Sequence, residues 1–203
     1  MKKYLLQITA SLLCLATLNG CMTMKPNDFK NKKPIFLLEE YFNGSTKAWG
    51  IFEDRFGNVK RQFTVDIEGK WDGNLLTLNE TFLFSDGEQD FRQWRIRKVG
   101  NGRYLGRAND VIGTATGIAS GNSLNWSYTL DLKMEGNKTM QVKFDDWMFL
   151  QPGNVLLNRA RMSKFGIELG QVTISFSKKQ PTYKERQSFN EKFAPERISA
   201  TFQ

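Results

Sequence analysis

The stretch LNWSYTLDLK at residues 124–133 decides the fold class. Apolar and polar side chains alternate along its whole length, which is the period of a β-strand with one buried face. Residues 59–67 alternate in the same way, with only Arg61 out of step. No comparable helical periodicity precedes residue 180, so the sequence predicts an all-β fold.

Glycines divide the sequence around these strands into segments of strand length. Several belong to turn-forming dipeptides such as Asp72-Gly73 and Asp86-Gly87. The glycines that mark turns are Gly57, Gly73, Gly87, Gly102, Gly121, Gly136 and Gly153. Their spacing of roughly fifteen residues is too long for an immunoglobulin-like sandwich and suits an up-and-down barrel. We therefore predict an antiparallel, lipocalin-like barrel of about eight or more strands over residues 34–178, able to hold one small ligand.

The N-terminus has the pattern of a secretory signal. Lys2 and Lys3 precede a mostly apolar, uncharged stretch over residues 4–18, which is shorter than the roughly 20 residues that cross a bilayer. The next residues, Leu18-Asn19-Gly20-Cys21, resemble the lipobox of bacterial lipoproteins, whose cysteine becomes the first mature residue and carries the lipid, such as palmitate. We predict a signal peptide over residues 1–20 and lipidation at Cys21. The alternative is a secreted, soluble protein with an unmodified cysteine.

The residues around the lipobox also indicate a location. The other cysteine, Cys14, lies within the signal, so the mature chain cannot form an internal disulfide. Met22 and Thr23, rather than Asp, follow Cys21. By resemblance to the lipoprotein sorting rule, this predicts recognition by the lipoprotein-sorting machinery of a Gram-negative envelope. The protein would then be anchored in the outer membrane through Cys21, facing the periplasm. Charged residues opposite the apolar strand faces argue against a barrel that spans the membrane itself.

The net charge of +8 is concentrated at the two ends of the chain. Residues 34–177 hold equal numbers of basic and acidic side chains. Because a nucleic-acid binder normally carries its positive face on the folded domain, we expect no nucleic-acid partner. Residues 21–33 form a lipid-anchored basic linker, either solvated or in contact with anionic lipid head groups. Residues 179–203, with two phenylalanines four apart between two prolines, are expected to be a C-terminal tail or short helix.

The chain contains no histidine, which removes several classes of chemistry. Ser-His-Asp and Cys-His hydrolysis, His-ligated zinc and the two-His iron triad all need an imidazole. We therefore expect no metal site and no cofactor. An enzyme built on this sequence would have to rely on carboxylates whose pKa values are tuned by burial.

Polar side chains on otherwise apolar strand faces are the candidate functional residues, since burying an unpaired charge is costly. Glu80 lies among leucines and phenylalanines, and in either register the next strand brings an arginine close enough to pair with it. The candidate ligand-binding residues are Asp54, Glu80, Arg92, Trp94, Asp146 and Asn158. They could orient a ligand head group or perform acid–base work in an apolar cavity. The alternatives are a salt-bridge network that sets strand register, or strand faces misassigned at a β-bulge.

The stretch DVIGTATGIASG at residues 110–121 has unusually small side chains for a strand. Small inward side chains allow a ligand or another strand to approach closely. A barrel corner is the competing explanation.

Several motifs carry a resemblance to a known family. Those near the start are LEEYFNG at 38–44, AWG at 48–50, DRFG at 54–57 and WDG at 71–73, together with Leu78, Glu80, Phe82, Asp86-Gly87, Arg92 and Trp94. DVIG at 110–113, FDDWM at 144–148 and NRARMSKFG at 158–166 follow. Over about residues 35–178 these motifs resemble domain-of-unknown-function family 3833, which consists of Gram-negative lipoproteins without an assigned activity. The resemblance implies location and domain limits, and no mechanism.

Three functions of different classes follow from these observations. The first is a lipid-anchored envelope lipoprotein that binds a small apolar, lipid-like ligand in a barrel cavity. The second is a cofactor-independent enzyme that uses Glu80, Asp146 or Asp54 on a lipid-like substrate. The third is a structural envelope protein with a solid barrel. We favour binding, because cavities are common in barrels of this size and the sequence contains no catalytic motif.

Overall fold

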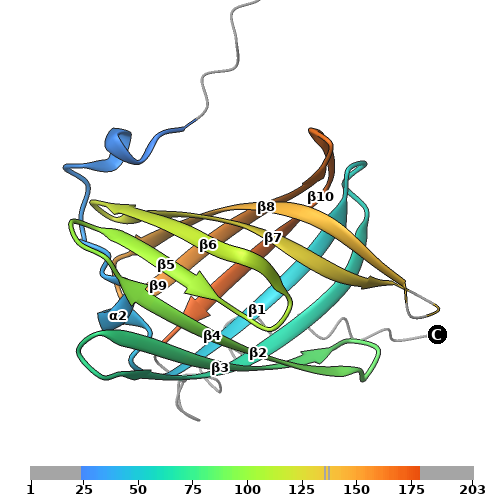
Figure 1. Cartoon of the computed structure of the whole chain (residues 1–203), viewed down its shortest axis with the longest axis horizontal. Helices are drawn as coiled ribbons and strands as arrows, with labels where there is room; N and C mark the ends of the chain where they lie inside the picture. The colour runs from blue at the N-terminus through green and yellow to red at the C-terminus, as the bar shows by residue number, and fades with distance from the viewer. Residues whose placement is uncertain (1–23, 135, 137, 179–203) are drawn as a thin grey trace, which may run out of the picture.

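The computed structural model describes residues 24–134, 136 and 138–178, which form a closed barrel of ten strands (Figure 1). Each strand pairs antiparallel with its neighbours in sequence, and β1 closes the barrel against β10. The strands are β1 (Gly44–Asp54), β2 (Val59–Trp71), β3 (Leu75–Phe84), β4 (Gln89–Lys98), β5 (Arg103–Arg107), β6 (Val111–Ser120), β7 (Ser123–Met134), β8 (Lys138–Gln151), β9 (Val155–Lys164) and β10 (Ile167–Ser177). The predicted all-β, antiparallel, up-and-down barrel of lipocalin type is confirmed.

Two of the strand connections were not marked by the glycines counted in the sequence. One joins β5 to β6 through Ala108, Asn109 and Asp110, and the other joins β9 to β10 through Phe165 and Gly166. The first contains no glycine, so the long interval between Gly102 and Gly121 conceals a five-residue strand and a hairpin. The seven glycine turns therefore account for eight strands, whereas the barrel has ten.

The small residues of β5 and β6 accommodate one large side chain of the barrel itself. A Cβ atom at Gly117 would lie 2.4 Å from the Trp126 ring, and one at Gly106 would lie 2.6 Å from it. Both glycines face inward beside the indole of β7, which is buried. The predicted close approach at residues 110–121 is thus made by Trp126 from the adjacent strand.

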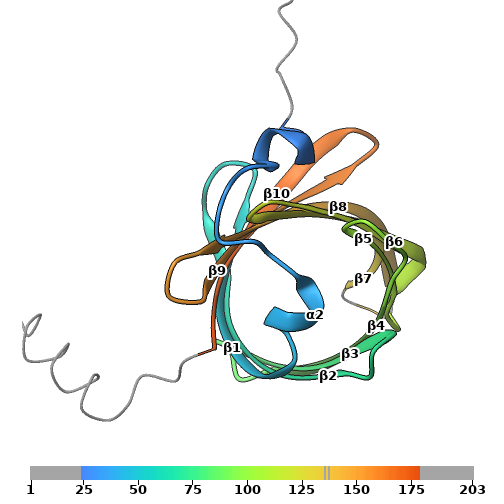
Figure 2. The same ribbon diagram turned by 90° about the vertical axis from the view of Figure 1, so that its left-hand side faces the viewer.

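A short helix, α2 (Leu38–Tyr41), closes one end of the barrel, where Figure 2 shows it lying across the ring of strands. Phe36, Leu38 and Phe42 are buried around it. The Phe42 carbonyl approaches Gly69 so closely that a Cβ there would lie 1.7 Å from its oxygen. We call α2 and its buried neighbours Phe36 and Phe42 the plug. The alternating strand pattern does not extend into this segment, so the sequence gives no indication that it closes the barrel.

The second helical segment, η1 (Pro26–Phe29), lies on the outside of the barrel against β6 and β7. The Phe29 ring packs 5.6 Å from Trp147 and 5.3 Å from Phe149, both on β8. At Gly121, a Cβ would lie 1.8 Å from the Phe29 carbonyl oxygen. Part of the segment expected to be a linker is therefore attached to the barrel wall.

Several predictions fall on residues outside the described ranges. These are the signal peptide at residues 1–20, the lipidated Cys21 and the C-terminal tail at 179–203. No helix among the described residues is long and apolar enough to cross a membrane.

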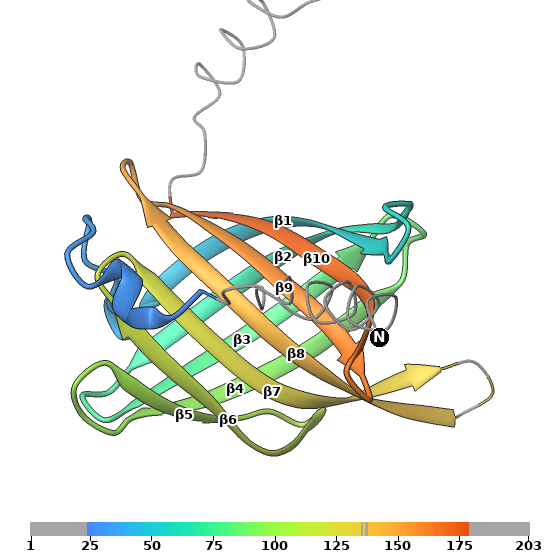
Figure 3. The same cartoon turned by 90° about the horizontal axis from the view of Figure 1, so that it is seen from above.

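The opposite end of the barrel from α2 is open. Inward side chains near α2, such as Ile67, Leu124 and Phe176, are buried. On the same strands, the inward side chains at the far end, such as Phe63 and Leu132, are only half-buried. Figure 3 shows the strands running obliquely between the two ends. The interior is therefore sealed at the α2 end and accessible from the end that carries the β1–β2 and β3–β4 turns.

Candidate functional site

A cavity of about 310 Å³ occupies the barrel interior. Its lining runs from Leu38 and Phe42 at the plug to Arg61 and Phe84 at the open end. This volume lies at the lower limit of the ~300–1,000 Å³ typical of ligand pockets, and the predominance of aromatic and aliphatic side chains is also typical. The polar members of the lining are Arg61, Glu80, Arg92, Tyr128, Asp146 and Asn158.

Glu80 and Arg92 form an ion pair on one side of the cavity. They are directly opposite each other on β3 and β4, and Arg92 Nε donates a hydrogen bond of 2.8 Å to Glu80 Oε2. Asp110 Oδ2 lies 3.7 Å from Arg92 Nη1. Burial alone would lower the pKa of Arg92, but the charges of Glu80 and Asp110 raise it, so the guanidinium stays charged.

The guanidinium also lies over two aromatic rings. Its carbon is 5.2 Å from the centroid of Phe82 and 5.5 Å from that of Trp94. Contacts of this kind stabilise a cation that is partly removed from water. Arg92 is therefore held by carboxylates and by the apolar wall together.

Asp146 and Asn158 lie on the other side of the cavity, on β8 and β9. Their exposed fractions are 6% and 3%. Asp146 Oδ1 and Asn158 Oδ1 are both buried without a hydrogen-bond partner among the described residues. Burial raises the pKa of Asp146 to about 7, while the charge of Arg92 opposes this rise. The carboxyl can therefore bind or release a proton near neutral pH.

Tyr128 connects the two sides. Its hydroxyl donates a long hydrogen bond of 3.5 Å to Asp146 Oδ2, and its ring stacks 5.2 Å from Phe144 and meets Trp94 edge-on at 5.5 Å. Burial raises the pKa of Tyr128 well above its ordinary value, so the group remains a neutral phenol. The alternating pattern places Tyr128 among the apolar members of its strand and gives no signal for its hydroxyl.

The structure places five of the six sequence-predicted residues in this cavity: Glu80, Arg92, Trp94, Asp146 and Asn158. The pairing expected between Glu80 and an arginine is present. Whether these residues bind a ligand stays a prediction.

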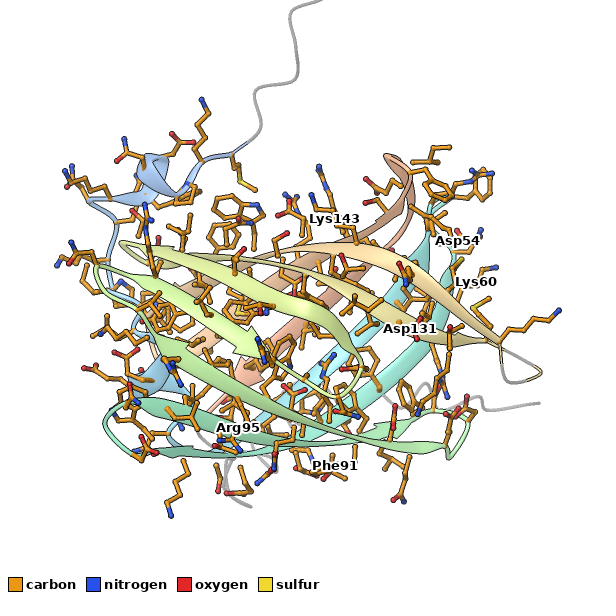
Figure 4. All side chains as sticks on the ribbon, in the orientation of Figure 1. Asp54, Lys60, Phe91, Arg95, Asp131 and Lys143 are labelled. Carbon is orange, nitrogen blue, oxygen red and sulfur yellow. The ribbon has the colours of Figure 1, made fainter. Side chains whose placement is uncertain are left out.

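Asp54 is the exception, because it lies at the end of β1, next to the β1–β2 turn at the rim, rather than inside the barrel. Its Oδ1 accepts hydrogen bonds from the backbone N–H groups of Phe56 (2.9 Å) and Asn58 (3.1 Å), and Lys60 Nζ lies 3.1 Å from Oδ2. Figure 4 shows Asp54 and Lys60 together at this end. A register shift between Phe52 and Glu53 breaks the alternation that placed Asp54 on the inner face.

The plug contains a buried carboxylate that the sequence analysis did not select. Glu39 accepts hydrogen bonds from Lys98 Nζ and from the Tyr104 hydroxyl, the latter at 2.7 Å. Burial, the largest effect, would raise the pKa of Glu39, but these hydrogen bonds together lower it. This ion pair joins α2 to β4 and β5 and so secures the closed end.

The acidic and cysteine side chains of the described ranges bear on metal binding and on proton transfer. No group of three or more acidic or cysteine side chains there is arranged to hold a metal ion. Glu80 and Asp146 are the carboxylates of the cavity lining, and burial places the pKa of Asp146 near neutrality, where it can transfer a proton.

Fold and cavity together define a class, that of a small closed β-barrel with an apolar interior and buried polar groups midway along it. The chain belongs to the family described as "Protein of unknown function (DUF3833)", which it matches over residues 15–178. The predicted family is thus confirmed. No curated protein matches the chain.

Proposed function

We propose that this protein is a lipid-anchored envelope lipoprotein that holds a small apolar, lipid-like ligand in its barrel cavity. The observation that carries the proposal is the 310 Å³ cavity, walled by aromatic and aliphatic side chains and open at one end. A solid structural barrel would fill this volume with side chains. Cys21, following an N-terminal signal pattern, supports anchoring at the outer membrane of a Gram-negative cell, facing the periplasm.

Native mass spectrometry of the protein purified from its own membrane tests the proposal. We expect a retained small molecule that is lost on denaturation. Ala160→Met would place a longer side chain in the cavity and lower the occupancy, whereas Thr129→Met, on the outward face of β7, would leave it unchanged. An empty wild-type barrel, or equal occupancy in both variants, would contradict binding in the cavity.

Anchoring is tested separately by Cys21→Ser. Labelled fatty acid should be incorporated into the wild-type chain in a Gram-negative host and not into the variant, because Cys21 is the predicted acceptor. Continued labelling of the variant would contradict the lipoprotein assignment and leave ligand binding untouched.

A cofactor-independent, carboxylate-based enzyme is the second candidate, and Asp146 is the observation that favours it. A buried carboxyl with a pKa near 7 suits general acid–base catalysis. Conversion of the retained molecule during incubation, abolished by Asp146→Asn, would favour the enzyme. Release of the molecule unchanged would favour the carrier.

A further inference from the structure

Both cationic side chains in the described cavity lining, Arg61 and Arg92, already form ion pairs. Arg92 faces Glu80 at 2.8 Å and Asp110 at 3.7 Å, so one positive charge serves two carboxylates. At the open end, Arg61 pairs with Asp86 at 2.9 Å and with Glu88, and its guanidinium carbon lies 3.6 Å from the Phe84 ring centroid. No other Lys or Arg belongs to the described lining. An anionic head group entering the cavity would therefore find no free cation.

Two of the described buried oxygens without hydrogen-bond partners belong to residues of the cavity lining. Asp146 Oδ1 and Asn158 Oδ1 both lack a hydrogen-bond donor within the described part of the chain, although both residues line the cavity. Asp146 and Asn158 are each more than nine-tenths buried, so bulk water does not reach these two oxygens freely. A buried acceptor without a donor is costly, and a ligand that supplies the donor recovers this cost.

Strand register places no donor directly opposite Asp146, although the Asn158 side chain lies close enough to lower the pKa of its carboxyl by a hydrogen bond. The cross-strand neighbours of Asp146 are Trp126 on β7 and Ala160 on β9. The Tyr128 hydroxyl reaches only the other oxygen, Oδ2, at 3.5 Å. Because Asp146 lines the cavity, a ligand held there lies beside its carboxyl group.

We infer that the cavity selects a ligand whose head group donates a hydrogen bond and carries no negative charge, such as an alkyl alcohol or an acylglycerol hydroxyl, over a fatty-acid anion. This inference rests on the proposed function, that the cavity holds a lipid-like molecule. The hydroxyl would donate to Asp146 Oδ1 while the alkyl chain lies along the aromatic wall. Above pH 7, where Asp146 is ionised, a carboxylate in the same place would add a further negative charge beside Glu80, Asp110 and Asp146.

The test compares head groups on one chain length. The full chain carrying Cys21→Ser, which leaves every barrel residue unchanged, is loaded with the neutral apolar probe N-phenylnaphthylamine. Dodecanol, its methyl ether and dodecanoate then compete for the probe. We expect dodecanol to bind about tenfold more tightly than the ether, because only the alcohol supplies a donor, and at least about tenfold more tightly than dodecanoate.

Two variants assign the selectivity to residues. Asp146→Leu should lower dodecanol affinity about tenfold, to that of the ether, because it removes the acceptor. Asp131→Leu is the matched control, with the same substitution at an outward position of β7, and should leave all three affinities unchanged. Glu80→Gln should raise dodecanoate affinity relative to dodecanol at least about tenfold, because it frees charge on Arg92. If Glu80→Gln fails to fold, the ether comparison and Asp146→Leu still decide.

The outcomes separate the inference from the function on which it rests. No binding of the probe or of any competitor would overturn the proposed function itself. Binding in which dodecanoate equals or exceeds dodecanol, or in which the ether equals the alcohol, would overturn the head-group inference and leave the carrier function standing. Equal affinities in Asp146→Leu and wild type would also overturn it.

Discussion

Strands β3 and β4 on one side of the cavity, and β8 and β9 on the other, each carry buried polar side chains, but in different conditions. Glu80 has a directly opposite cross-strand neighbour, Arg92, that neutralises it. Asp146 lies opposite Trp126 and Ala160, which offer no charge. On the first side Glu80 is ion-paired, although Asp110 beside the same arginine keeps one oxygen without a partner. On the second side Asp146 and Asn158 each keep an acceptor without a donor. The difference teaches that the register across a strand decides which carboxylate serves the structure and which is available to a ligand.

Breaking the Glu80–Arg92 ion pair should have the largest effect on stability. Arg92→Met would leave Glu80 buried without its cation, and we expect the free energy of unfolding to fall by about 3–5 kcal/mol. Urea unfolding measures the change. Arg95→Met removes the same charge from the outward face of β4, where Figure 4 shows Arg95 pointing away from the barrel, and should change stability by less than about 0.5 kcal/mol. Similar losses in both variants would show that Glu80 does not depend on Arg92.

On the other side of the cavity, Asp146 should make the stability of the protein depend on pH. The pKa of Asp146 is about 7 in the folded protein against an ordinary value of 3.8. Between these values the folded state holds a proton that the unfolded state lacks, so stability falls as pH rises, by about 1.4 kcal/mol per unit. Between pH 5 and 7 this amounts to about 2–3 kcal/mol.

Asp146→Asn should remove that slope, as measured by urea unfolding at each pH. The same substitution at Asp66, an exposed carboxylate on β2, should leave the wild-type profile unchanged. A variant profile parallel to the wild type would mean that Asp146 is ionised throughout this range.

A third prediction concerns the packing of Trp126, which lies opposite Asp146 on β7. Gly117→Ala would place a methyl group 2.4 Å from the Trp126 ring, and overpacking of this kind costs about 1–3 kcal/mol. Thermal unfolding measures the loss, with Thr116→Ala on the outward face as the control. A stability equal to the wild type would show that Trp126 can shift, and that the Asp146 side is less rigid than its packing implies.

The smallest effect is expected from Tyr128→Phe, which removes the long hydrogen bond to Asp146 Oδ2. The loss of stability should be about 0.5 kcal/mol, because the bond measures 3.5 Å. Since this hydroxyl lowers the pKa of Asp146, its removal should raise that pKa and move the pH profile upward. A downward movement would contradict the assigned direction of the hydrogen bond.

The alternating stretch at residues 124–133 was sufficient to predict the fold class. A two-residue period is a local property of the chain, and β7 buries Leu124 and Trp126 as that period requires. The same local rule identified the inward positions of Glu80, Arg92, Trp94, Asp146 and Asn158. It failed at Asp54, where the register shift near Phe52 turns the strand and the carboxylate caps its own turn.

Other features depended on contacts between residues distant in sequence. Closure of β1 against β10, the α2 plug with Glu39 bonded to Lys98 and Tyr104, and the place that Gly106 and Gly117 leave for Trp126 are all of this kind. The cross-strand neighbours of each buried carboxylate also depend on such contacts. The sequence by itself determined which side chains face inward wherever the strands are regular, because that follows from strand periodicity. Only the tertiary structure decided which arginine meets Glu80, and that Asp146 meets a tryptophan and an alanine, because register sets which side chains become neighbours.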